Sequence, residues 1–161
     1  ISMGVIDDVT LTYTKNSAVF KSDEYTIYTR LIEGKYFAYQ KMFTEGEINT
    51  CASRTALIGA MTRAKMCTEE KQPAVFQIED DVLNISIRDK LADYQEQVPL
   101  QETVCKSIRL GFDSRLVLET LKAFTCDNIA LGFTSPRTPM IVEAEDSDMK
   151  AMVLPVAIRE A

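Results

Sequence analysis

The chain has 161 residues, of which 46% are hydrophobic and 26% are charged, and this composition excludes an intrinsically disordered tail. The net charge of −6 excludes a protein that binds nucleic acid over its whole surface, because phosphate binding needs a face of Lys and Arg. No stretch approaches the roughly 20 consecutive apolar residues of a membrane span, and no signal segment opens the chain, so we expect a cytoplasmic protein.

The first third of the chain predicts a short antiparallel meander. Residues 9–14 alternate apolar and threonine side chains, which is the pattern of a half-buried strand. Further strands are predicted at residues 18–20 and 25–32, and the turn-forming residues 33–35 end the run.

A helical pattern follows over residues 53–67, with Ser53 as the predicted N-cap. Four residues at helical spacing form its predicted buried face: Leu57, Ala60, Ala64 and Cys67. Strands are then predicted at residues 73–78 and 82–87. The acidic residues 79–81 between them predict the turn of a hairpin.

The second half of the chain predicts more strands and one more helix. A polar alternation over residues 92–105 and a strand at 107–112 precede a helix at 115–124, capped by Asp113 or Ser114. Its predicted buried residues are Val117, Leu121 and Phe124. Three further strands are predicted at residues 129–134, 140–144 and 150–156, so the fold class is α+β with two helices. The best domain boundary is at residues 44–46.

The cysteines do not predict a metal site. Cys51, Cys67, Cys105 and Cys126 have no C-x-x-C spacing, and the chain contains no histidine. We therefore expect reduced thiols, no metal and no cofactor.

Five motifs in order along the chain resemble those of one family, the bacterial DNA polymerase III beta subunit, a sliding clamp and processivity factor. They are Leu-Ile-Glu-Gly-Lys-Tyr-Phe-Ala-Tyr at 31–39, Ala-Met-Thr-Arg-Ala at 60–64, Gly111-Phe112 with Leu118, Leu121 and Lys122, Cys-Asp-Asn-Ile at 126–129, and Ala-Met-Val-Leu-Pro-Val at 151–156. Phe37-Ala38 replaces the family's Pro-Asp, and Ala-Ile-Arg-Glu-Ala at 157–161 replaces its Met-Arg-Leu tail.

The resemblance implies a DNA-clamp fold, with one complete two-helix, antiparallel-sheet repeat at residues 46–161. Residues 1–45 would be the end of the second clamp domain and the interdomain linker. The first domain and most of the second would lie outside this chain, which alone should not close a ring. In the family, the complete homodimer encircles duplex DNA, binds it without sequence specificity, and holds polymerase and clamp-loader peptides. It has no catalytic residues.

The resemblance also implies three sets of site residues. A peptide-binding groove would use Phe37, Lys41, Met42, Asp113, Leu116, Arg137, Pro139, Met152, Leu154, Pro155 and Val156. Arg54, Arg63, Lys65, Arg115 and Lys122 would face DNA, and Met66 and Cys67 would lie at the dimer interface. From the residues alone, Met152, Leu154 and Val156 could equally be strand core, and the basic residues ordinary solvated helix faces.

Acidic clusters leave other functions open. One is Glu79-Asp80-Asp81, and the other comprises Glu143, Glu145, Asp146 and Asp148. Neither matches a calcium-binding loop, and both are expected in solvated turns. The alternatives are a small metal-dependent enzyme that uses these clusters and a stand-alone β-rich peptide-binding module with no role on DNA.

Overall fold

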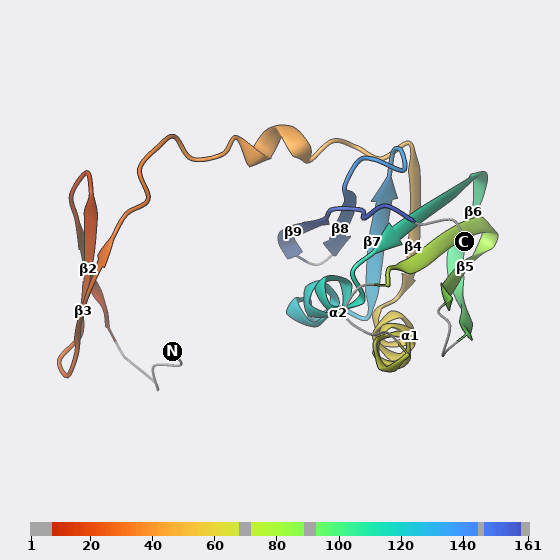
Figure 1. Cartoon of the computed structure of the whole chain (residues 1–161), viewed down its shortest axis with the longest axis horizontal. Coiled ribbons are helices and arrows are strands. Elements are labelled where there is room, and N and C mark those ends of the chain that lie inside the picture. Colours follow the sequence, from red (N-terminus) through yellow and green to blue (C-terminus); the bar gives the residue numbers. More distant parts are fainter. Residues whose placement is uncertain (1–7, 68–71, 89–92, 145–146, 159–161) are drawn as a thin grey trace. The chain divides into compact units, whose positions relative to one another are not determined.

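The computed structural model describes residues 8–67, 72–88, 93–144 and 147–158. The chain divides into two compact units, Ile1–Ala38 and Tyr39–Ala161 (Figure 1). Each unit has its own sheet, so each is described by itself.

The first unit is a three-stranded antiparallel meander of β1 (Thr10–Tyr13), β2 (Ser17–Lys21) and β3 (Thr26–Arg30). All three predicted strands are therefore confirmed. The turns are closed by short-range hydrogen bonds: the Thr14 N–H donates to the Ser17 carbonyl at 2.8 Å, and the Ser22 N–H to the Tyr25 carbonyl at 2.8 Å.

The prediction that the first strand is half-buried is wrong, since every residue of β1 is exposed. Leu11, Phe20 and Ile27 are cross-strand partners and share one apolar face of the sheet, and Leu11 is 52% exposed. The alternation of apolar and threonine residues at 9–14 therefore predicted the apolar face of the strand correctly, but not its burial. No second layer among the described residues of this unit covers it, so the face stays in contact with solvent.

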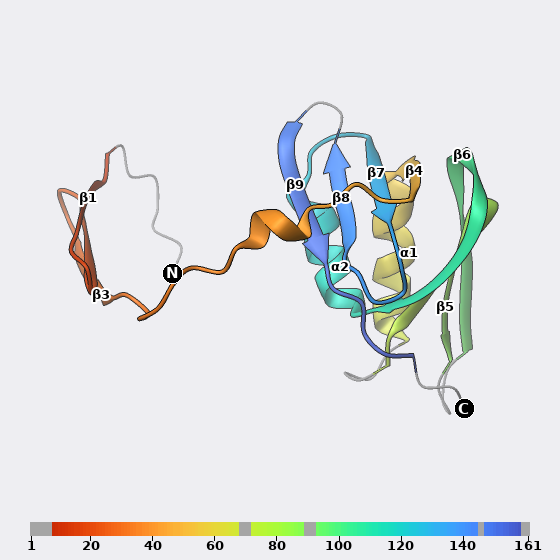
Figure 2. The same ribbon diagram turned by 90° about the horizontal axis from the view of Figure 1, so that it is seen from above.

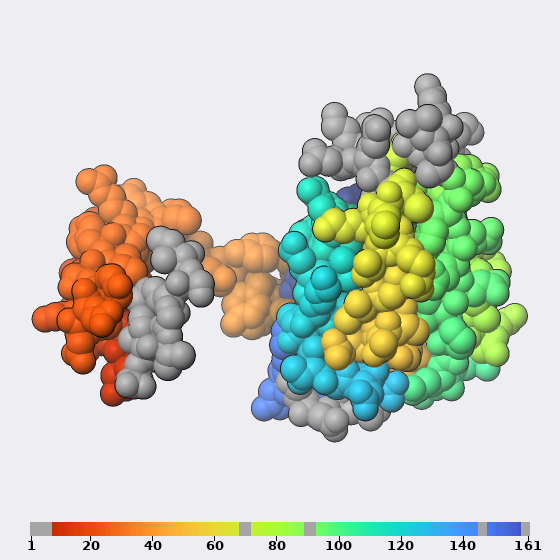
Figure 3. Space-filling view, turned by 90° about the horizontal axis from the view of Figure 1, so that it is seen from below, coloured from red at the N-terminus to blue at the C-terminus, as the bar shows by residue number. Residues whose placement is uncertain are grey.

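The second unit is a six-stranded antiparallel sheet with the strand order β5-β6-β4-β7-β8-β9. Its elements are η1 (Tyr39–Met42), β4 (Ile48–Ser53), α1 (Arg54–Met66), β5 (Ala74–Arg88), β6 (Asp93–Phe112), α2 (Ser114–Ala123), β7 (Asn128–Phe133), β8 (Met140–Ala144) and β9 (Ser147–Val153). The two helices lie side by side on one face of the unit (Figures 2 and 3). The α+β class with a two-helix antiparallel repeat is confirmed.

Helix α1 begins where the sequence predicted. The Ser53 hydroxyl accepts a hydrogen bond from the Ala56 N–H at 3.4 Å, as an N-cap does. The fully buried Ala60 and Ala64 carry small side chains, so the helix can pack closely against its neighbours. Cys67 is the C-cap and is half-buried, not a core residue as predicted, because the helix ends before it.

Helix α2 is capped by Asp113, which decides between the two predicted caps. The Asp113 carboxylate accepts a hydrogen bond from the Arg115 N–H at 2.8 Å. Val117, Leu121 and Phe124 are buried as predicted. They join a core to which alternate residues of the sheet contribute, including Phe76 and Phe112 in edge-to-face contact at 5.1 Å between ring centroids.

The predicted hairpin at residues 79–81 is wrong. Residues 74–88 form one long strand, β5, which pairs with β6 from Ala74↔Phe112 to Arg88↔Asp93. Asp80 has a φ of 51°, and the register shifts on both of its sides. The acidic residues therefore form an irregularity within the strand, which bends the hairpin without ending it.

The polar alternation predicted at 92–105 and the strand predicted at 107–112 are one strand, β6. β4 and the helical turn η1 were not predicted. β9 begins and ends three residues earlier than predicted.

Candidate functional site

The C-terminal strap, residues 154–158, leaves the end of β9 and runs across to the β5–β6 side of the sheet (Figures 1 and 2). The Val156 N–H donates a hydrogen bond to the Gly111 carbonyl on β6 at 2.8 Å. A hollow of about 450 Å³ lies beside the strap. Its lining residues are Arg109, Leu110, Gly111, Pro136, Arg137, Pro155, Val156, Ala157 and Ile158.

The strap exposes apolar side chains. Leu154 is 58% exposed and Val156 is 41% exposed, whereas Val153, the last residue of β9, is only 3% exposed. The alternative that Leu154 and Val156 are strand core therefore does not hold. Met152 lies on β9 opposite Ile141 and is half-buried.

A hydrogen-bonded turn holds another wall of the hollow. The Ser135 N–H donates to the Thr138 hydroxyl at 2.9 Å, and the Thr138 hydroxyl donates to the Ser135 carbonyl at 3.0 Å. The Arg137 N–H donates to the Ser135 hydroxyl at 3.3 Å. This network fixes the backbone that carries the exposed Arg137 next to the strap.

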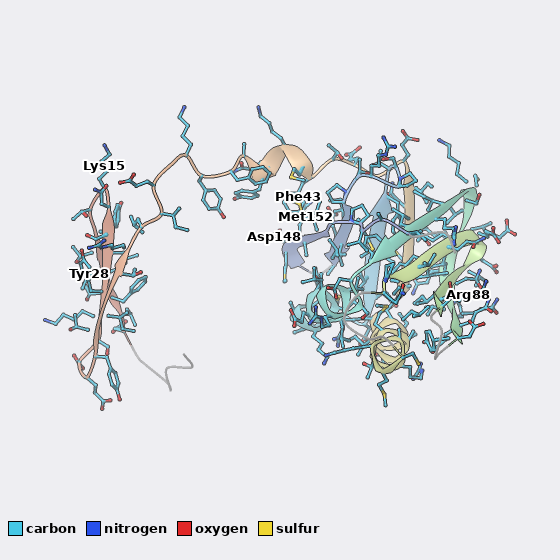
Figure 4. All side chains as sticks on the ribbon, viewed as in Figure 1. Lys15, Tyr28, Phe43, Arg88, Asp148 and Met152 are labelled. Atoms are coloured by element: carbon cyan, nitrogen blue, oxygen red, sulfur yellow. The ribbon has the colours of Figure 1, made fainter. Side chains whose placement is uncertain are left out.

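The other predicted groove residues lie on several elements. Lys41 and Met42 belong to η1. Figure 4 labels Phe43, which follows η1, and Met152 on β9. Phe43 lines a hollow together with Ile141 of β8 and Lys150 of β9. Asp113 and the 51% exposed Leu116 lie at the start of α2, and Pro139 is half-buried just before β8.

Only part of the predicted groove is brought together. Arg137, Pro155 and Val156 line one hollow, whereas Phe37 belongs to the first unit and is 65% exposed there. Arg109 and Ile158 line the same hollow and were not predicted as groove residues. Gly111 belongs to one of the family motifs but was not predicted to line the groove. No local pattern connects these residues to the strap, because β6 and the strap meet only through the fold.

Helices α1 and α2 together form a basic face on an acidic chain. They carry five basic side chains and one acidic side chain, whereas the whole chain has a net charge of −6. Figure 3 shows the two helices next to each other on this face. Lys65 and Lys122 are exposed in the last turns of their helices.

Two of the predicted DNA-facing arginines are engaged near their helix starts. The Arg54 Nε–H donates to the Cys126 carbonyl at 2.6 Å, and its backbone N–H donates to the Asp127 carbonyl at 2.9 Å. Arg115 forms an ion pair with Asp113 at 3.5 Å. Arg54 therefore anchors the start of α1 as well as contributing charge.

Arg63 belongs to a polar network that connects α1 to β6. Its Nε–H donates to the Glu96 carboxylate at 2.8 Å, and its Nη2 forms an ion pair with the other carboxylate oxygen. The Tyr94 hydroxyl lies 2.9 Å from the Ala60 carbonyl and also within hydrogen-bond distance of Glu96. The hydrogen bond from Arg63 holds the pKa of Glu96 below its usual range, and burial raises the pKa of Tyr94.

The predicted interface residues lie at the end of α1. Met66 is 82% exposed, whereas Cys67 is half-buried. A single exposed apolar side chain is normal on a protein surface, so the exposure of Met66 alone does not mark an interface.

The acidic clusters do not form one group. Glu143 forms an ion pair with Lys150 at 2.7 Å across β8 and β9, and Asp148 lies on β9, so these residues are on strands and not in the predicted turn. Glu145 and Asp146 lie outside the described residues. Among the residues that the structure describes, no cluster of Cys, Asp or Glu could hold a metal ion, and no helix is long and apolar enough to cross a membrane.

Comparisons with known proteins agree on one family. The family described as "DNA polymerase III beta subunit, C-terminal domain" matches residues 43–157. The Beta sliding clamp of Staphylococcus aureus is 24% identical over 155 residues, which are 93% of this chain and 41% of the relative. The Beta sliding clamp of Halalkalibacterium halodurans is 25% identical over 140 residues, which are 84% of this chain and 37% of the relative.

Solved structures share the fold. A DNA polymerase sliding clamp from Caulobacter crescentus has a TM-score of 0.84 at 14% identity, over 93% of this chain and 41% of that protein. A DNA polymerase III beta chain from Streptococcus pneumoniae has a TM-score of 0.79 at 20% identity, over 92% and 41%. The chain thus spans about two fifths of the length of these relatives.

Proposed function

Because this chain belongs to the DNA polymerase III beta subunit family, we propose that it serves as part of a sliding clamp that keeps a replicative polymerase on DNA. The clamp is an accessory protein without catalytic chemistry. In this proposal, the complete homodimer encircles duplex DNA, and its peptide groove holds polymerase and clamp-loader segments.

One observation carries the peptide-binding role: the C-terminal strap presents Leu154 and Val156 to solvent directly after the buried Val153. Exposed apolar side chains on an ordered backbone can take a leucine or phenylalanine anchor of a peptide. Met152, two residues before Leu154, adds an unbranched side chain that adapts its shape to an anchor. Each well-placed anchor contributes on the order of 1 to 3 kcal/mol.

The basic face of α1 and α2 supports a role on DNA. A sliding contact needs attraction to phosphates that does not depend on sequence, because strong contacts to base edges would favour particular positions. Lys65 and Lys122 place charge on long side chains in exposed positions on this face. The acidic remainder of the chain disfavours DNA binding elsewhere.

The domain assignment is part of the same proposal. Residues 46–161 would be the third clamp domain, and residues 1–45 would be the end of the second domain with the linker. Met66, at the exposed end of α1, would contact the neighbouring subunit.

A direct titration tests the peptide-binding role. A fluorescein-labelled synthetic peptide with one leucine and one phenylalanine anchor is titrated with the chain and followed by fluorescence anisotropy. We expect saturable, weak binding, and a peptide with both anchors replaced by alanine should not bind. Equal binding of both peptides would overturn the proposed groove.

A further inference from the structure

The strap and β6 approach each other more closely at Gly111 than any other residue type would allow. A Cβ atom at this position would lie 2.8 Å from the Val156 carbonyl oxygen, 3.0 Å from a side-chain carbon of Ile158 and 3.2 Å from the Pro73 ring. Carbon atoms do not approach a carbonyl oxygen to 2.8 Å without displacement. The missing side chain of Gly111 therefore provides the space in which the strap lies.

The same short segment also positions α2. Asp113 follows Gly111 by two residues, and its carboxylate and carbonyl accept hydrogen bonds from the Arg115 N–H at 2.8 Å and the Val117 N–H at 3.1 Å. Leu116 lies between these two donors in the first turn of the helix. Residues 111–113 thus hold the strap on one side and the start of α2 on the other.

We propose that Gly111 is a positioning residue for the peptide groove. Gly111 lets the strap lie against β6, and this fixes the positions of Leu154 and Val156 relative to Leu116. Leu116 lies on α2, an element separate from the strap. The inference rests on the proposed peptide-binding function. The groove wall formed by Leu154 and Val156 is then present only while the strap is docked at Gly111.

The strap is attached to β6 at the Gly111–Val156 bridge, so we expect a methyl group at Gly111 to displace it. The described backbone hydrogen bond of the strap is the one from Val156 to Gly111. Ile158 supplies the apolar contact, since it lies over Gly111 and lines the hollows on both sides of this point. The core residues Leu110 and Phe112 flank Gly111 and are 1% and 0% exposed.

The test compares three variants for two independent properties. Gly111→Ala places a methyl group against the strap. Ile158→Ser removes the apolar contact without altering β6 or any predicted groove residue. Gly59→Ala is the matched control, because the atoms nearest to its Cβ belong to the flexible end of the Arg63 side chain, at 3.2 Å. The first property is amide hydrogen exchange of Val156, measured by NMR, and the second is affinity for the leucine–phenylalanine peptide.

We expect Gly111→Ala and Ile158→Ser to exchange the Val156 amide at least about tenfold faster and to bind the peptide about fivefold or more weakly. The control should match the unmodified chain in both properties. If Gly111→Ala does not fold, Ile158→Ser alone decides the question.

The outcomes separate this inference from the proposed function. Faster exchange at Val156 with unchanged affinity would overturn the positioning role and leave the peptide-binding function standing. An unmodified chain that protects the Val156 amide but binds no peptide would overturn the function and, with it, the inference. Unchanged exchange in both variants would show that the strap is not held at Gly111.

Discussion

Arg63 on α1 and Glu96 on β6 lie 33 residues apart in the sequence and form a bidentate ion pair that connects the helix to the sheet. The pair gives Arg63 a structural partner on a helix that is otherwise proposed to face DNA. Its guanidinium charge is therefore partly balanced within the protein, which weakens the attraction of Arg63 to phosphate.

Removing the carboxylate should change how stability depends on pH. The pKa of Glu96 in the folded chain is below the value of about 4.3 for an unperturbed glutamate. The ionised carboxylate therefore stabilises the fold above that unperturbed value, and the stabilisation is lost as the pH falls through the lowered pKa. We expect Glu96→Gln to lower the melting temperature at pH 7 and to lower it less at pH 3, because the stabilisation decreases as the pH falls. A difference that is constant from pH 7 to pH 3 would show that the ion pair does not stabilise the fold.

Asp80 should not tolerate a β-branched residue. Its φ of 51° lies in the left-handed region, which aspartate adopts more readily than valine does. We expect Asp80→Val to lower the free energy of unfolding by about 1 to 2 kcal/mol in urea denaturation. Asp81→Val is the control, because Asp81 is exposed and does not have a positive φ. Equal effects of the two substitutions would argue against the irregularity at Asp80.

Binding of linear duplex DNA by this chain alone should be weak. The net charge of −6 opposes it, and in the proposed clamp the closed ring, not surface affinity, retains the DNA. We expect dissociation constants above the micromolar range at physiological salt. At low salt, Lys122→Glu should weaken the residual binding more than Lys15→Glu, which makes the same charge change in the first unit. Sub-micromolar binding at physiological salt would refute the proposed mode of DNA retention.

The chain should sediment as a monomer or a weakly associating species. Met66 is exposed and is proposed to contact a domain of the neighbouring subunit. This chain spans 41% of the length of its relative from Staphylococcus aureus, and in the proposed domain assignment it does not include that domain. Analytical ultracentrifugation at increasing concentration measures this directly. A tight, concentration-independent dimer would contradict the proposed role of Met66.

The sequence predicted the elements whose signals are local. Ser53 and Asp113 mark the helix starts by capping, and the spacing of Val117, Leu121 and Phe124 marks the buried face of α2. The acidic residues around Asp80 gave a false turn because turn-forming composition also suits a bend inside a long strand. β4 was missed because Asn49, Thr50 and Cys51 lack a clear apolar alternation.

The candidate site was less predictable because its parts meet only through the fold. The resemblance to the family supplied the groove residues, and the exposure of Leu154 and Val156 supports them. The contact between Gly111 and Val156 joins positions that no periodicity connects. Likewise, nothing in the pattern around Arg63 indicates that its partner is Glu96.

Leu154→Ala tests the central claim most directly, with affinity for the leucine–phenylalanine peptide and melting temperature measured on the same sample. Leu11→Ala is the control for exposure, because Leu11 is 52% exposed and Leu154 is 58% exposed. Leu131→Ala is the control for burial, because Leu131 is 1% exposed and its loss should destabilise the fold by about 2 to 5 kcal/mol. We predict that Leu154→Ala weakens peptide binding about tenfold, with a melting temperature close to that of Leu11→Ala. A lowered melting temperature like that of Leu131→Ala, with no selective loss of peptide affinity, would assign Leu154 to the core and contradict the peptide groove.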